Sequence, residues 1–258
     1  FKDCLIMALD KNSNSFTFIF AIIMVVVVGA VLSFAAMSLK PLQVKNNTDK
    51  KMMNILTSIG VEAERTNAKE LFYANVGKRY ILNSKGEIIT THEGEIDPTN
   101  TEDAFNVDVK KEFRDPTMSI DDRNYPLYMA TVDGEEVAII PLVGKGLWGP
   151  IWGYVSLKRD FNTVFGATFD HKTETPGLGA EIKESWFSAP FVGKTIYDES
   201  GALVSVNVIK GSAEPSNPHE VDGITGGTIT SNGVDEMLER TFGIYDPYFK
   251  SNSQISMK

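Results

Sequence analysis

Residues 222–231, DGITGGTITS, hold the grouping of residue types most suited to binding chemistry in this chain. Gly226 and Gly227 lack Cβ atoms, so the backbone there can approach a bulky ligand closely. A helix predicted to follow would offer unpaired N–H groups and a partial positive charge to a phosphate. Thr228 would present its hydroxyl to that phosphate. Asp-Gly and Gly-Gly pairs usually form ordinary turns, so the stretch alone leaves both interpretations open.

The helix after this stretch is predicted from spacing. Apolar residues recur at helical intervals between positions 234 and 242. Ser231 or Asn232 is the predicted N-cap, since both residue types favour that position.

Two other glycine-rich stretches precede it. Gly144–Pro150 contains three glycines, and Trp148 at its tip would offer a flat aromatic face or fill the core. Residues 171–179 join a predicted strand to a predicted helix, with Pro176-Gly177 marking a type II turn. Thr175 and the amides after it would donate hydrogen bonds to a ligand, or Glu174 and Thr175 would only cap the turn.

The titratable residues indicate no catalytic or metal site. His171 and Glu174 have suitable side chains for acid–base chemistry, but no nucleophile motif accompanies them, so a structural polar contact is the better interpretation. His92, His171 and His219 lack metal-ligand spacing. Cys4 is the only cysteine, which excludes an iron–sulfur cluster or Cys-x-x-Cys-His haem held by this chain. A redox carrier here would therefore be organic.

The charge balance is acidic. The chain has 258 residues and a formal net charge of −9. The excess of acidic residues lies in residues 40–258, and no basic run interrupts that part. Because nucleic-acid binders present clustered basic residues, nucleic acid is excluded as a partner.

Residues 16–39 form an uncharged apolar segment. As a helix it would be about 36 Å long, enough to cross a hydrocarbon core of about 30 Å. A cleaved signal peptide is the alternative, but its apolar region usually spans only about 7–15 residues. A retained transmembrane helix is therefore predicted. More lysines follow the segment than precede it, which favours a cytoplasmic location for the large domain. Because long domains cross membranes largely regardless of such charges, the orientation stays open.

The remaining chain predicts an α+β fold around a largely antiparallel sheet. Hairpins are predicted at Asn83–Gly86 and at Asp133-Gly134. Further predicted strands cover 151–157, 163–169 and 203–209. Predicted helices cover 48–59, 67–74, 102–113 and 180–188.

Taken together, these stretches resemble the C subunit of the Na+-translocating NADH:quinone reductase, a family of FMN-binding domains related to the G subunit of the Rnf complex. That family contains an Asp-x-x-(Ser/Thr)-Gly-Ala-Thr motif. Asp222, Thr225, Gly226 and Thr228 match it, whereas Gly227 replaces the usual alanine. The apolar segment and three further stretches also match the C subunit in order, so the resemblance covers nearly the whole chain. Those stretches are Gly144–Pro150, Glu174–Gly179 and Trp186–Lys194.

The resemblance implies that Thr228 carries FMN covalently through a phosphoester. A separate flavin transferase would transfer FMN from FAD, so Thr228 is a modification site and no residue here is catalytic. Asp222 would be recognised by that transferase or would order the loop. The other residues implied or proposed to contact the cofactor are Thr225, Gly226, Gly227, Asp222, Leu147, Trp148, Glu174, Thr175, Leu178 and Gly179.

The resemblance also implies an electron relay within a sodium pump of six subunits in the bacterial inner membrane, which oxidises NADH and reduces a quinone. The expected organisation is a cytoplasmic N-terminus (1–15), a transmembrane helix (16–39), a membrane-proximal part (40–125) and an FMN-binding part (126–258), with the soluble domain periplasmic. A flavoprotein of the Rnf type and a non-redox membrane-anchored binding domain remain as alternatives.

Overall fold

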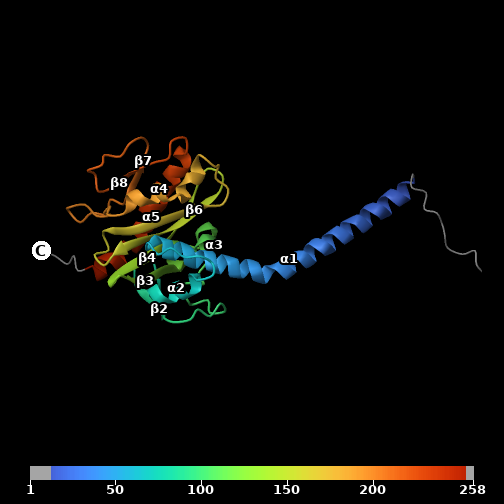
Figure 1. Cartoon of the computed structure of the whole chain (residues 1–258), viewed down its shortest axis with the longest axis horizontal. Coiled ribbons are helices and arrows are strands. Elements are labelled where there is room, and N and C mark those ends of the chain that lie inside the picture. The colour runs from blue at the N-terminus through green and yellow to red at the C-terminus, as the bar shows by residue number, and fades with distance from the viewer. Residues whose placement is uncertain (1–12, 254–258) are drawn as a thin grey trace, which may run out of the picture. The chain divides into compact units, whose positions relative to one another are not determined.

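The computed structural model describes residues 13–253, so Cys4 and most of the predicted cytoplasmic segment 1–15 lie outside the described residues. The first element is α1 (Asn14–Ser58), a single helix of 45 residues with Pro41 inside it. It contains both the predicted membrane helix and the separate helix predicted at 48–59 (Figure 1). Among the described residues, α1 is the helix long and apolar enough to cross a membrane. Contacts divide the chain into two compact units, Phe1–Thr48 and Asp49–Lys258.

The second unit, called the domain below, is built on a six-stranded antiparallel sheet, which confirms the predicted α+β fold. The order of its strands is β2-β1-β3-β4-β5-β6. The strands are β1 (Val76–Leu82), β2 (Ile88–His92), β3 (Tyr125–Val132), β4 (Glu135–Lys145), β5 (Pro150–Lys158) and β6 (Val164–His171). Asp133 and Gly134 have φ angles of 50° and 83°, so the predicted tight hairpin joins β3 to β4.

The helices of the domain are α2 (Ala68–Asn75), α3 (Val109–Arg114), α4 (Ser185–Ser188) and α5 (Thr228–Asn252), with 3-10 turns η1 (Ile120–Asp122), η2 (Gly179–Lys183) and η3 (Ala189–Phe191). Helix α2 matches the helix predicted at 67–74 within one residue, whereas those predicted at 102–113 and 180–188 are shorter than expected. The helix predicted at 102–113 begins only at Val109, because Asp108 caps it by accepting a hydrogen bond from Lys111 N at 3.1 Å. The helix predicted at 180–188 is two short turns.

A small parallel sheet of β7 (Asn207–Ile209) and β8 (Glu220–Asp222) lies next to α5. The strand predicted at 203–209 is therefore only three residues long. Its first half is taken up by an isolated bridge between Tyr197 and Leu203 and by Ser205, which has a φ of 64°. A positive φ interrupts the extended backbone that a strand requires.

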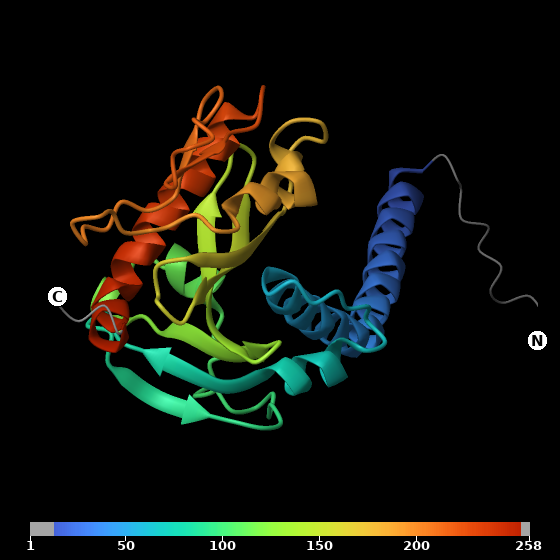
Figure 2. The same cartoon turned by 60° about the vertical axis from the view of Figure 1, so that its left-hand side comes forward.

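Each face of the large sheet covers its own core. Along β4, Val137 and Ile139 face a core shared with α2 and the last turns of α1, whereas Ala138, Ile140 and Leu142 face a core shared with α5. This alternation is the two-residue period of a strand buried on both faces, and Figure 2 shows α5 lying across the sheet. The division predicted between residues 125 and 126 stays a prediction. It falls within β3, which pairs with β1 in this sheet.

The end of α1 is fixed to the sheet within the domain. Met52, Ile55 and Leu56 are buried, and the Ser58 carbonyl accepts a hydrogen bond from the Ser156 hydroxyl on β5. A Cβ at Gly166 on β6 would lie 2.4 Å from that carbonyl oxygen. Glycine is required there because the helix end and the strand approach so closely.

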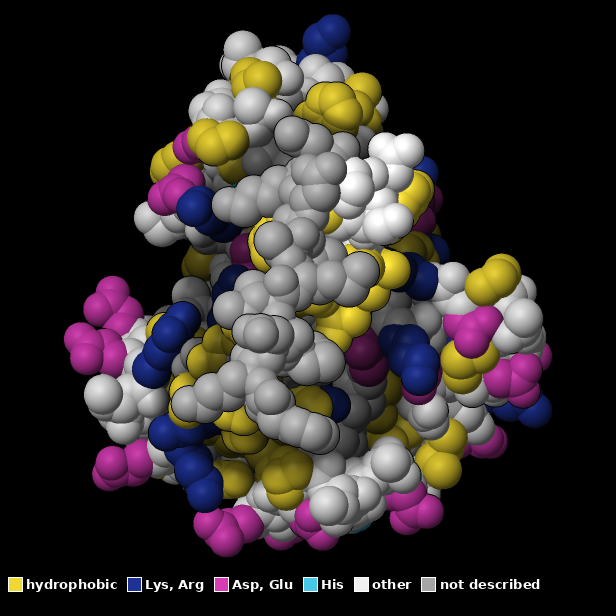
Figure 3. Space-filling view, turned by 90° about the vertical axis from the view of Figure 1, so that its right-hand side faces the viewer, with side chains coloured by type: hydrophobic (Ala, Val, Ile, Leu, Met, Phe, Trp, Pro, Cys, Tyr) yellow, Lys and Arg dark blue, Asp and Glu magenta, His cyan; other side chains and the backbone are white. Residues whose placement is uncertain are grey.

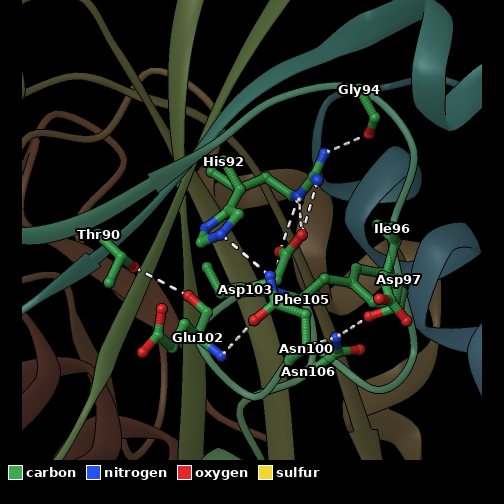
Figure 4. A network of polar contacts seen from close by, with 12 residues as sticks. Thr90, His92, Gly94, Ile96, Asp97, Asn100, Glu102, Asp103, Phe105 and Asn106 are labelled. Carbon is green, nitrogen blue, oxygen red and sulfur yellow. Dashed lines mark hydrogen bonds and ion pairs between the residues drawn. The ribbon is translucent and has the colours of Figure 1, made fainter.

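A buried ion pair holds the long connection between β2 and α3 (Figure 4). Arg79 on β1 donates to Asp103 through Nε at 2.9 Å and Nη2 at 2.7 Å, and Nη1 donates to the Gly94 carbonyl at 3.0 Å. Burial opposes ionisation of Asp103, but hydrogen bonds from Arg79 and Phe105 N and the Arg79 charge outweigh it and lower the pKa of Asp103. The connection is thereby tied to the central sheet.

The surface carries both signs of charge. Lys and Arg side chains are interspersed with Asp and Glu side chains on the face shown in Figure 3. Two exposed ion pairs lie at one end of β4. Lys158 on β5 pairs with Glu135 at 3.4 Å, and Arg159, the residue after β5, pairs with Glu136 at 3.1 Å. Such exposed pairs contribute only about 0–1 kcal/mol each.

Candidate functional site

The three glycine-rich stretches meet around one buried carboxylate, that of Glu174. Its Oε1 accepts a hydrogen bond from the Trp148 backbone N–H at 2.8 Å, and its Oε2 accepts one from the Thr230 hydroxyl at 2.6 Å. Glu174 is 5% exposed. One side chain therefore joins the loop after β4, the loop after β6 and the first turn of α5.

Two glycines make this convergence possible. A Cβ at Gly146 would lie 2.6 Å from Glu174 Oε1, and a Cβ at Gly179 would lie 2.3 Å from the Thr230 hydroxyl oxygen. Both distances are shorter than any tolerated contact, so only glycine leaves room for the hydrogen bonds of Glu174.

The loop after β6 is shaped as predicted. The Leu178 N–H donates to the Thr175 carbonyl at 3.1 Å across Pro176 and Gly177, and Gly177 has a φ of 75°. This is the type II turn expected for Pro-Gly. Thr175 and Leu178 are both exposed.

His171 acts structurally in the same loop. Its Nδ1 accepts a hydrogen bond from the Glu174 N–H at 3.1 Å, so the predicted polar contact between these two residues is confirmed. The carboxylate of Glu174 is directed instead to Trp148 and Thr230.

The start of α5 differs from the prediction. The helix begins at Thr228 with Gly227 as its N-cap, whereas the prediction placed the cap at Ser231 or Asn232. Ser231 is not the cap because it already lies inside the helix, where its N–H donates to the Gly227 carbonyl at 2.9 Å. Its hydroxyl accepts a hydrogen bond from the Ile224 N–H at 2.9 Å and closes the loop back on the helix. Thr228 thus occupies the first helical position, where backbone N–H groups lack intrahelical partners.

Thr228 has a half-buried side chain whose hydroxyl makes no hydrogen bond with any described residue. It lines a pocket of about 230 Å³ at the N-terminus of α5. The pocket is lined by Lys210, Gly211, Gly223, Ile224, Thr225, Gly226, Thr228, Ser231 and Asn232. Of these described residues only Lys210 is charged, and it forms no ion pair with a described residue. A free hydroxyl and a free cation at a helix N-terminus suit a phosphate.

Lys210 is the pocket residue that sequence reasoning missed. It stands at the end of β7, and β7 reaches the loop through β8, where the Gly223 N–H donates to the Ile209 carbonyl at 2.8 Å. Its only sequence signal is the adjacent Gly211, which has a φ of 104°.

Asp222 serves the loop. Its Oδ1 accepts a hydrogen bond from the Ala213 N–H, so it ties the turn after Lys210 to the segment that leads to Thr228. Asp222 does not line the pocket, and of the two roles considered for it, the ordering of the loop is the one visible in these contacts.

Several apolar side chains around the stretches are left exposed. Trp148 is 65% exposed and Leu147 49% exposed, so Trp148 does not fill the core. Leu178 is 41% exposed and lies over the Thr228 loop, since a Cβ at Gly226 would be 2.7 Å from its Cδ2. Exposed apolar groups next to a pocket with polar lining are typical of ligand-binding sites.

The helix α1 is long and apolar enough to cross a membrane, and the comparisons define the class of the domain that holds the pocket. Residues 146–242 match the family model of the FMN-binding domain. The C subunit of the Na(+)-translocating NADH-quinone reductase of Pseudomonas aeruginosa is 31% identical over 253 residues, which cover 91% of this chain and 93% of that protein. The corresponding protein of Vibrio campbellii is 31% identical over 83% of this chain and 84% of that protein. This chain belongs to the family of the C subunit of the Na(+)-translocating NADH-quinone reductase.

Solved structures give the same result. The crystal structure of the corresponding protein from Parabacteroides distasonis is 38% identical, with a TM-score of 0.70 over 85% of this chain and 98% of that chain. NqrC of Shewanella oneidensis, 24% identical, has a TM-score of 0.65 over 79% of this chain and 96% of that chain and shows the shared fold.

Proposed function

We propose that this chain is the electron-relay member of a Na+-translocating NADH:quinone oxidoreductase and carries FMN joined to Thr228 through a phosphoester. The observation that carries the proposal is the Thr228 hydroxyl, which is free of hydrogen bonds to described residues and lines a pocket at the N-terminus of α5. The family of the chain supports the electron-relay role and the flavin.

The residues present fit an FMN phosphate. The first turn of α5 supplies unpaired N–H groups and the positive end of the helix dipole, and Lys210 supplies a full positive charge. Gly226 and Gly227 lack Cβ atoms, so the backbone beside Thr228 can approach the phosphate closely. A phosphodiester retains one negative charge, which these groups would balance.

The flavin ring would lie against the exposed apolar residues Leu147, Trp148 and Leu178, with Thr175 and Gly179 at its polar edge. When bound, FMN supplies one- and two-electron redox chemistry, and the protein supplies position and electrostatics. Glu174 holds together the loop after β4, the loop after β6 and the first turn of α5. Thr225 and Asp222 complete the loop that carries the attachment point.

A covalent link has a physical use here. The pocket is small and lies next to exposed side chains, so the chain encloses little of a flavin. A tether keeps the cofactor at high effective concentration without burying it. The exposed edge would then remain accessible to redox partners.

The proposed maturation needs a separate flavin transferase. The Thr228 hydroxyl oxygen would bond to the FMN phosphorus of FAD, the bond between the two phosphates would break, and AMP would leave with the hydroxyl proton released. The chain itself would contribute only the acceptor and the loop that presents it.

The proposed setting is the bacterial inner membrane. The apolar segment 16–39 would cross it once, with the N-terminus in the cytoplasm and the domain in the periplasm, within a complex of six subunits. The relatives named above are subunits of the quinone reductase, which supports this complex over the Rnf type. A purified complex should oxidise NADH with a quinone in a sodium-dependent manner; ferredoxin-dependent reduction of NAD instead would favour the Rnf type.

In-gel flavin fluorescence tests the attachment site. The full chain is co-produced with a flavin transferase, denatured and separated on a gel viewed under ultraviolet light. The native chain should fluoresce and Thr228→Ala should be dark. Thr131→Ala is the matched control, because Thr131 is an exposed threonine on β3 that does not line the pocket; it should fluoresce. A fluorescent Thr228→Ala band would contradict the proposal.

A further inference from the structure

Asp170, the residue before His171 at the end of β6, has a nearly buried carboxylate that faces the end of α1. Its Oδ2 lies 2.7 Å from Lys50 Nζ, and its side chain is only 15% exposed. Oδ2 accepts no hydrogen bond of ordinary geometry from a described residue, so the ion pair with Lys50 is its direct compensation. A carboxylate with so little solvent depends strongly on such a partner.

A second cation and an indole surround the same pair. Lys110 on α3 places its ammonium 3.3 Å from the ring centre of Trp152, and Lys50 lies 6.0 Å from it. Trp152 on β5 is the cross-strand partner of Asp170. Burial lowers the pKa of Lys110 to about 8, and the charge of Asp170 partly offsets this effect.

From Asp170 a continuous series of hydrogen bonds reaches the flavin site. Asp170 Oδ1 accepts from the His171 N–H at 2.9 Å, and His171 Nδ1 accepts from the Glu174 N–H at 3.1 Å. Glu174 then accepts from the Trp148 N–H and the Thr230 hydroxyl. Each step is a direct contact of 3.1 Å or less.

We propose that Asp170 is a positioning residue for the flavin site and that its ion pair with Lys50 sets the position of residues 171–178 relative to Thr228. Lys50 lies on the helix that also carries the apolar segment 16–39. The geometry of the flavin pocket therefore depends on how the end of that helix is seated on the domain. This inference rests on the proposed function, since it concerns the site of the proposed flavin.

The first measurement needs no flavin. In the full chain bearing Thr228→Ala, hydrogen exchange is followed in the peptides that contain residues 146–149 and 171–178. Lys50→Met and Asp170→Asn should each speed exchange in both peptides by about three- to tenfold, the effect expected for loss of a partly buried ion pair. Exchange in the double variant should be about as fast as in either single variant, because both substitutions remove the same contact.

Two controls make this result specific. Lys158→Met removes the exposed Lys158–Glu135 pair at the other end of β5 and should leave both peptides unchanged. Lys50→Arg keeps the charge and should restore native exchange. Unchanged exchange in Lys50→Met and Asp170→Asn, or faster exchange spread over the whole domain, would overturn the proposal.

The second measurement uses the flavin-carrying chain. Lys50→Met and Asp170→Asn should shift the flavin midpoint potential and change its visible circular dichroism, while Lys158→Met and Lys50→Arg should match the native protein. Native values in all four variants would overturn the positioning role. If the native chain carries no flavin, the proposed function fails, and the exchange experiment still decides whether Lys50 and Asp170 position the loops.

Discussion

The Thr230 hydroxyl donates a 2.6 Å hydrogen bond to the buried carboxylate of Glu174, 56 residues earlier in the chain. This contact holds the first turn of α5 against the loop after β6, and the Trp148 N–H completes it from a third stretch. Thr228, the proposed attachment residue, lies two positions before Thr230. The position of the flavin thus depends on a residue that need not touch it.

Removing this acceptor should loosen the domain. Glu174→Ala would leave the buried Thr230 hydroxyl and the partly buried Trp148 N–H without their acceptor, and an unpaired buried group costs about 1–3 kcal/mol. We expect the free energy of unfolding of the full chain in detergent, measured by urea denaturation, to fall by about 2–4 kcal/mol. Thr228→Ala is the control and should have little effect, because its hydroxyl has no described partner. Equal losses in the two variants would show that Glu174 is not the central contact.

The close approach at Gly179 gives a second test. Gly179→Ala would place a Cβ 2.3 Å from the Thr230 hydroxyl oxygen, so the loop or the helix must shift. We expect destabilisation of about 1–3 kcal/mol and weaker flavin attachment by the transferase, measured from in-gel fluorescence. Gly243→Ala is the matched control: apart from the adjacent residues and backbone of its own helix, no described atom would lie within 4 Å of its Cβ. In the interior of α5 this change should stabilise by up to about 1 kcal/mol. Similar behaviour of both variants would be inconsistent with this packing.

Lys51 should make the free energy of unfolding vary with pH in the alkaline range. Burial lowers the pKa of Lys51 to about 8 from 10.5, partly offset by the charge of Asp108, and its ammonium donates to the Phe105 carbonyl. Between these two pH values the unfolded chain binds the proton and the folded chain does not. The folded state therefore gains stability as pH rises through that window, by at most about 1.4 kcal/mol per pH unit. Below pH 8 the residue is protonated in both states and contributes no slope.

The comparison with Lys51→Met isolates this effect. The difference in free energy of unfolding between the native chain and Lys51→Met should change in favour of the native chain from pH 8 to pH 10.5. Urea denaturation at half-unit intervals would measure it. Curves that stay parallel across this window would rule out the shifted pKa.

The Arg79–Asp103 pair should be costly to break. Asp103→Ala would leave a guanidinium with 0% side-chain exposure without its carboxylate, a change that typically costs about 3–5 kcal/mol. The exposed Lys69–Glu95 pair at 3.4 Å serves as the control, and Glu95→Ala should cost less than about 1 kcal/mol. Thermal or urea unfolding would compare them. A loss below about 1 kcal/mol for Asp103→Ala would contradict the anchoring role of this pair.

Local sequence patterns predicted much of the fold. The Asp133-Gly134 hairpin followed from residues that accept a positive φ, and the apolar face of α5 followed from its spacing, since Val234, Leu238 and Phe242 are fully buried. Short-range preferences determine such elements, so the sequence reveals them.

The start of α5 and the centre of the site depend on longer-range contacts. Three hydroxyl residues precede the helix face, and each favours an N-cap position. Instead, the Thr230 hydroxyl donates to Glu174 and the Ser231 hydroxyl accepts from the Ile224 N–H. The helix begins earlier, with Gly227 as its cap. Likewise, Lys210 reaches the pocket only because β7 pairs with β8. Such pairings across the chain have no local signal.

Peptide mapping by mass spectrometry would show directly whether Thr228 carries the flavin. The full chain, made with a flavin transferase, is digested, and the peptide containing residues 222–231 is fragmented. We expect a mass increase of one FMN less one water, with fragment ions that place it on Thr228. An unmodified peptide, or FMN on Thr225 or Thr230, would contradict the proposed attachment.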